Sequence, residues 1–167
     1  MSVVATIARH ARPWLAGLTH AQWITQLFVR LFIGYFFFET GWAKTGNLDA
    51  MAERFSGWGI PVPAFSAALS AYTELVGGAL IVLGLATRLV AIPLCINMVV
   101  AILVVNVKSV TGLDEFVELS EPLYALTFLW LFFSGPGWVS LDHLLFRRLV
   151  RPDAAGAPAM RATRSPM

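Results

Sequence analysis

The sequence predicts an all-α protein that crosses a membrane as a four-helix bundle, and three observations support this fold class. First, 57% of the 167 residues are hydrophobic and only 13% are charged, a composition far more apolar than that of an ordinary soluble domain. Second, long apolar runs alternate with polar connectors along the chain. Third, basic residues flank these runs unevenly, which is typical of proteins inserted in a membrane with one orientation.

The first membrane span follows a basic N-terminal lead-in. Residues 1–21 carry arginines and a tryptophan, and we expect them to lie along the membrane surface. The run Gln22 to Ala43 predicts a spanning helix although it contains Arg30 and, on the opposite side, Glu39. One face of this helix combines polar and small side chains, namely Gln26, Arg30, Gly34, Phe37, Gly41 and Lys44.

The second span carries a carboxylate near its centre. It follows a short amphipathic helix predicted from Leu48 to Trp58. The run Ala64 to Leu85 would extend ~33 Å, enough to cross a bilayer. An unpaired charge at the position of Glu74 would cost ~3 kcal/mol or more. Small residues share its helix face, so we expect Glu74 to face protein; they are Ala67, Ser70, Ala71, Gly77 and Gly78.

Two further apolar runs complete the predicted bundle. The third span, Leu89 to Val107, has no charged residue, and Pro93 is expected to kink it. After an acidic connector, the stretch Pro122 to Leu141 predicts a short fourth span, whose helix should end near Ser134 because a Gly-Pro-Gly sequence follows. The chain is thus divided into a lead-in (1–21), a membrane domain (22–142) and a basic tail (143–167) that we expect to be disordered.

The distribution of basic residues predicts the orientation. The two ends of the chain and the turn between the second and third spans hold most of the arginines, whereas the other two connectors hold only Lys44, Arg54 and Lys108. Basic loops stay in the cytoplasm, so we expect both termini there. The arginines on that side are Arg9, Arg12, Arg88, Arg147, Arg148, Arg151, Arg161 and Arg164.

A polar layer inside the bundle forms the candidate site. Counted from the predicted span ends, Arg30, Glu74 and Asn97 lie at similar depths, which predicts an Arg30–Glu74 ion pair. With Lys44 these residues would form a polar pocket. Two interpretations stay open: the charges only lock the helices in register, or they bind a polar head such as a quinone carbonyl or relay a proton. Secondary candidates nearer the outer surface are Lys44 itself, Glu39, Tyr72, Asn106 and Glu121.

Several other chemistries find no support in the sequence. The single Cys95 excludes an intramolecular disulfide, a CxxC pair and a cysteine-built metal site within one chain. His20 and His143 have no diagnostic spacing for a metal or haem, so no metal site is predicted. A net charge of +2 without a basic aromatic surface does not favour nucleic acid.

Five motifs in order resemble the DoxX family of membrane proteins. The first is the set Arg30, Gly34, Gly41 and Lys44 in the first span. The other four are GIPVPAF from Gly59, ELVGG from Glu74, LGLATR from Leu83 to Arg88, and GPGWVSLD from Gly135 to Asp142. The resemblance covers Leu27 to Asp142. It implies a multi-pass, four-helix protein of the bacterial inner membrane with both termini in the cytoplasm.

The resemblance also suggests a function. The family takes its name from a small membrane subunit of an archaeal thiosulfate:quinone oxidoreductase, and other members are linked to oxidative-stress complexes. Our leading hypothesis is therefore an accessory subunit of quinone-linked redox or oxidative-stress chemistry, with no intrinsic cofactor and with a quinone or a membrane or peripheral partner protein as the electron carrier. The alternative is a non-enzymatic scaffold or small transporter subunit whose buried charges only fix helix packing. A homo-oligomer stays open in both cases.

Overall fold

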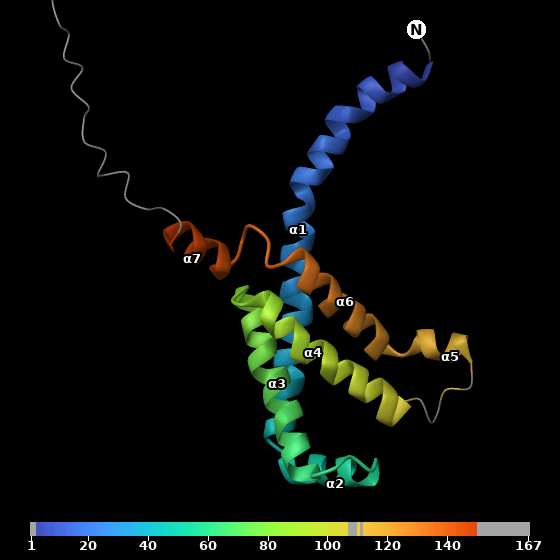
Figure 1. Cartoon of the computed structure of the whole chain (residues 1–167), viewed down its shortest axis with the longest axis vertical. Helices are drawn as coiled ribbons and strands as arrows, with labels where there is room; N and C mark the ends of the chain where they lie inside the picture. Colours follow the sequence, from blue (N-terminus) through green and yellow to red (C-terminus); the bar gives the residue numbers. More distant parts are fainter. Residues whose placement is uncertain (1–2, 107–109, 111, 150–167) are drawn as a thin grey trace, which may run out of the picture.

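The described part of the chain consists of helices joined by short turns and connectors (Figure 1). The computed structural model describes residues 3–106, 110 and 112–149, and no strand occurs among them. The all-α class is therefore confirmed for this part of the chain. The elements are α1 (Val3–Thr45), α2 (Leu48–Gly57), α3 (Pro63–Leu83), α4 (Thr87–Ala101), the π-helix η1 (Ile102–Asn106), α5 (Leu113–Glu118), α6 (Ser120–Ser134) and α7 (Leu141–Leu149).

Three of the predicted spans are long and apolar enough to cross a membrane. They are Ala21–Thr45 within α1, Pro63–Leu83, which is α3, and Thr87–Val105 across α4 and η1. Helix α6 has 15 residues and a length of about 22 Å, so it is shorter than the other three. Helix α1 runs without a break through the predicted end of the lead-in, and its N-terminal part leans away from α3 (Figure 1).

Helices α1 and α3 run antiparallel and approach closely at glycines. A Cβ atom at Gly34 would meet Val82 at 2.8 Å, and one at Gly41 would meet the backbone of Leu75. The missing side chains allow the two backbones to touch, as small residues do between membrane helices. The partner's number falls as the number in α1 rises, so Gly34 lies beside the C-terminal end of α3 and Gly41 lies beside its middle.

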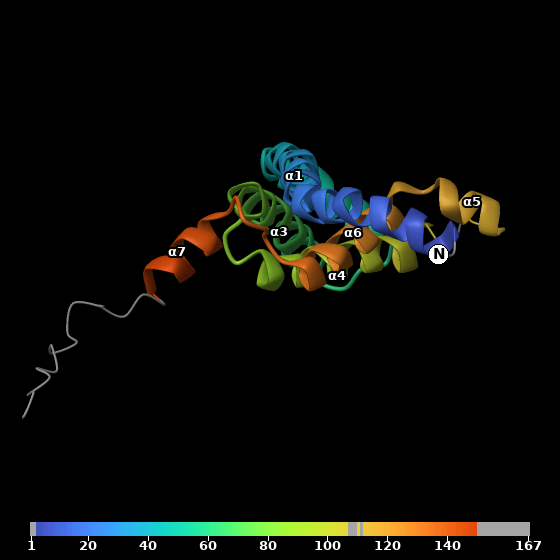
Figure 2. The ribbon, with the colours of Figure 1, turned by 90° about the horizontal axis from the view of Figure 1, so that it is seen from above.

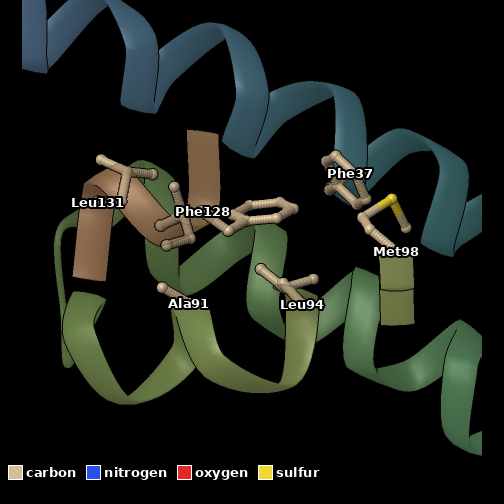
Figure 3. Close-up of a cluster of buried hydrophobic side chains, with 7 residues drawn as sticks. Phe37, Ala91, Leu94, Met98, Phe128 and Leu131 are labelled. Atoms are coloured by element: carbon tan, nitrogen blue, oxygen red, sulfur yellow. The ribbon is translucent and has the colours of Figure 1, made fainter. Parts of the chain in front are cut away.

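Side chains from α1, α3, α4 and α6 meet in one hydrophobic core (Figure 3). Seen from above, α3 lies between α1 and α4 (Figure 2), and α6 packs along α4. The rings of Phe37 and Phe128 pack edge to face with their centroids 4.8 Å apart, a favoured aromatic geometry. The core therefore ties α6 to the three longer helices. Its buried members are Phe37, Ile81, Ala91, Leu94, Met98, Phe128 and Leu131.

The connectors follow the predictions in part. The predicted amphipathic helix after the first span is confirmed as α2. Helix α6 ends at Ser134 as the Gly-Pro-Gly sequence predicts, because Gly135 has φ 77°. Helix α7 covers the first residues of the segment predicted to be a disordered tail. Leucines recur at helical spacing in this segment, at positions 141, 144, 145 and 149, a pattern that favours a helix. The rest of that tail, 150–167, lies outside the described residues.

We expect Gly41→Ala to lower the free energy of unfolding by about 1–3 kcal/mol. The added methyl group would meet the backbone of Leu75, which cannot rotate away, so α1 and α3 would have to separate. Gly57→Ala is the matched control, since nothing lies within 4 Å of a Cβ atom at Gly57. Unfolding of the full chain in detergent measures both variants. Equal effects of the two substitutions would contradict the close α1–α3 contact.

Candidate functional site

A buried carboxylate, Glu74, is paired with the ammonium group of Lys44. The Lys44 Nζ atom lies 2.6 Å from Oε1 and 2.5 Å from Oε2 of Glu74. Lys44 lies in the last turn of α1 and Glu74 in the middle of α3, so the pair follows directly from the α1–α3 register. A cation at the C-terminal end of a helix also interacts favourably with its carbonyl groups.

Three further polar side chains complete the site around Glu74. The Thr40 hydroxyl shares its one proton between Oε2 of Glu74 at 3.2 Å and the Phe37 carbonyl oxygen at 3.1 Å, and the Asn97 amide donates to Oε1 at 2.8 Å. The Ser70 hydroxyl donates to the Asn97 side-chain oxygen at 3.0 Å. We call these five residues, Thr40, Lys44, Ser70, Glu74 and Asn97, the Glu74 cluster. It connects α1, α3 and α4 through hydrogen bonds.

Burial differs strongly between the two charged partners. The side chain of Glu74 is 2% exposed and that of Lys44 is 30% exposed. Glu74 is therefore shielded from its surroundings, whereas Lys44 is accessible from outside the chain. An ammonium group has three donors, and Lys44 directs bonds to the two oxygens of Glu74. The third N–H group of Lys44 has no acceptor among the described residues.

The predicted ion pair between Arg30 and Glu74 is wrong. Arg30 is buried, but its guanidinium group donates to four backbone carbonyls. The oxygens of Ile81 and Val82 lie 3.0 Å away and that of Val139 lies 2.8 Å away, and the Pro136 oxygen is the fourth acceptor. The prediction compared the depths of the two residues from the predicted ends of their spans. Helix α1 extends well beyond the end of α3, and the glycine contacts set a different register between the two helices.

Arg30 instead holds the chain together at the other end of α3. The last carbonyls of a helix lack partners within the helix and carry partial negative charge, which suits a guanidinium group. Nearby, the backbone N–H of Asp142 donates to the Gly84 oxygen at 3.1 Å. Its carboxylate accepts bonds from the N–H groups of Ala86 and Thr87 at 2.8 and 3.3 Å. The sequence motifs LGLATR and GPGWVSLD thus meet in one structural junction with Arg30.

The structure separates the remaining candidates. Lys44, Glu74 and Asn97 come together, whereas Glu39 and Tyr72 are exposed and Glu121 is half-buried. The side chain of Asn106 lies outside the described residues. Sequence reasoning missed Thr40, although its spacing of four from Lys44 on one helix was an available signal. Within the described residues no group of three His, Cys, Asp or Glu side chains could hold a metal ion.

Comparison with known proteins gives consistent matches. The DoxX family matches residues 25–107, a range that contains the whole Glu74 cluster. The chain is 34% identical over 157 residues to "Uncharacterized membrane protein Rv3486" of Mycobacterium tuberculosis, which covers 85% of this chain and 94% of that protein. It is 32% identical over 125 residues to "Putative oxidoreductase CatD" of Bacillus subtilis, which covers 74% of this chain and 89% of that protein. No solved structure matches the chain.

Double-mutant cycles should distinguish the two possible partners of Glu74. We expect Lys44→Met and Glu74→Gln to be coupled by about 1–3 kcal/mol in the free energy of unfolding, because the two side chains contact each other. Arg30→Met and Glu74→Gln should be coupled by less than about 0.5 kcal/mol, since they share no hydrogen-bond partner. Unfolding in detergent at fixed pH gives both values. A larger coupling to Arg30 than to Lys44 would contradict the site described above.

Proposed function

Because this chain belongs to the DoxX family of membrane proteins, we propose that it is an accessory membrane subunit of quinone-linked redox or oxidative-stress chemistry. The Glu74 cluster is the proposed binding site for the polar head of a quinone. The name of the Bacillus subtilis relative, "Putative oxidoreductase CatD", supports the choice of a redox role. The choice of the Glu74 cluster as the binding site rests on the exposure of Lys44 and on its third N–H donor.

The observation that carries the proposal is the uneven burial of the Lys44–Glu74 pair. A pair that served packing alone could be fully enclosed, but here the Lys44 side chain is 30% exposed beside a carboxylate that is 2% exposed. Its third donor can therefore reach a carbonyl oxygen of a molecule dissolved in the bilayer. The residues present fit a quinone head in this respect.

Each residue of the cluster has a defined task in this proposal. A bound quinone would accept electrons from a redox partner protein, and its reduction also consumes protons. Lys44 donates a hydrogen bond to the carbonyl oxygen and keeps it close to Glu74. Glu74 holds or passes a proton at its carboxylate. Asn97 and Ser70 orient the carboxylate from α4 and α3, and Thr40 does so from α1.

The proposal includes a four-helix arrangement in the bacterial inner membrane, with both termini in the cytoplasm. The packing of α6 into the common core supports α6 as the fourth span. Arg30 binds carbonyls at the end of α3 and in the loop after α6, which supports a common side for the α3–α4 turn and the C-terminal segment. The excess of basic residues in these parts of the sequence supports a cytoplasmic location for that side.

A second candidate function is a non-enzymatic scaffold or small transporter subunit. One observation favours it: each carboxylate oxygen of Glu74 already has two donors of this chain within hydrogen-bond distance. A fully satisfied polar cluster specifies helix packing without any ligand. In this case the cluster would matter for stability alone.

Quinone binding by the purified full chain tests the first proposal. We expect a short-chain ubiquinone or menaquinone analogue to quench tryptophan fluorescence on binding, and Lys44→Met to weaken binding about 10- to 100-fold, because a charged hydrogen bond is lost. Arg54→Met is the matched control, since it removes an exposed cation on α2. The double variant Lys44→Met with Glu74→Gln leaves no unpaired charge, so it should fold yet bind poorly.

The outcomes separate the two candidate functions. Failure of the unchanged chain to bind either analogue would contradict the quinone proposal. Equal affinity of Lys44→Met and Arg54→Met would contradict the role of Lys44. If the cluster variants lower the unfolding temperature while quinone binding is absent throughout, the scaffold function is favoured.

A further inference from the structure

Helix α1 presents a second stripe of residues on the side opposite the bundle. The inward side carries the buried residues Arg30, Gly34, Phe37 and Gly41 and the half-buried Lys44. Residues two positions before each of these point about 200° away, and they alternate at spacings of four and three, the pattern of a helix-packing seam. These outward residues are large and exposed. We call them the α1 outer stripe: Phe28 (54% exposed), Phe32 (72%), Tyr35 (61%), Glu39 and Trp42 (67%).

Glu39 is the unusual member of this stripe. Gly41 lies against the backbone of Leu75, so in antiparallel packing Glu39 is level with about residue 77. That position is about 6 Å along the axis from the middle of α3, which is itself long enough to cross the membrane. An exposed carboxylate therefore lies near the centre of the bilayer. Ionisable groups at this depth are rare unless they meet a partner.

The described part of this chain offers Glu39 no such partner. Among its cationic side chains, Lys44 is held by Glu74 and Arg30 by backbone carbonyls. Arg54 belongs to α2, and Arg88 lies at the start of α4. A second copy that packed its own outer stripe against this one would place two carboxylates together. Charge complementarity therefore favours a different protein.

We propose that the α1 outer stripe binds a transmembrane helix of another protein, and that this helix carries a lysine or arginine facing Glu39. The aromatic side chains on either side of Glu39 would exclude lipid and water from the ion pair. In such surroundings a charge-assisted hydrogen bond is strong and selective. Small residues on the partner helix would provide the space that Phe32, Tyr35 and Trp42 need. This proposal does not depend on quinone binding.

Photo-crosslinking in the cells that naturally produce the full chain tests this interface. The photo-reactive residue benzoylphenylalanine replaces Tyr35, and the adduct is identified by peptide mass spectrometry. Tyr72, an exposed tyrosine on α3, is the matched control position. We expect the Tyr35 position to yield one adduct, on a transmembrane segment of another protein that contains a lysine or arginine. The Tyr72 position should not yield it.

Glu39→Gln then tests the role of the charge. Because Glu39 is exposed and has no partner in the described residues, the unfolding temperature should stay unchanged, while the adduct yield should fall about 3- to 30-fold. Exchange of the two charges, Glu39→Lys here and glutamate for the basic residue of the partner, should restore the yield.

Four results would overturn the proposal. The first is an adduct on α1 of a second copy, which would identify a homo-oligomer. The second is an adduct on lipid alone or none at all, which would show a face that contacts lipid only. The third is an adduct yield that Glu39→Gln leaves unchanged, and the fourth is the same adduct from the Tyr72 position. None of these readouts involves a quinone, so failure here is separate from failure of the proposed function.

Discussion

The close contact between α1 and α3 determines most of what this structure can do. Gly41 and Gly78 remove side chains where the two backbones touch, and without a hydrophobic effect between membrane helices such contacts decide which residues face one another. The resulting register places Lys44 beside Glu74 and places Arg30 beside the end of α3. A shift by one helical turn would leave three buried or half-buried charged groups without their partners.

The two buried polar regions at the two ends of this contact have different chemistry. Arg30 bonds only to backbone carbonyls, and each of its bonds fixes the position of a chain segment. Such a group fixes the positions of chain segments, because four of its five N–H donors are bonded to backbone carbonyls, which do not change protonation state. The Glu74 cluster contains a carboxylate, an ammonium group and neutral donors. These groups can exchange a proton or a hydrogen bond, which is why the proposed function is assigned there.

The outward side of α1 adds a separate constraint. Helix α1 packs against the bundle with small and polar residues on one side. On its other side it exposes large aromatic residues and Glu39. The two carboxylates Glu39 and Glu74 lie within about one helical turn of each other along α3, yet only Glu74 is neutralised within the described chain.

The amino-acid sequence by itself determined the all-α class, three spans, helix α2 and the end of α6, because apolar length, amphipathic spacing and the Gly-Pro-Gly sequence act locally. It also determined that Arg30, Gly34, Phe37, Gly41 and Lys44 share one helix face. Only the tertiary structure decided which of these cations meets Glu74. Residue spacing sets the direction of a side chain around its own helix, whereas the relative height of two helices depends on where their backbones touch.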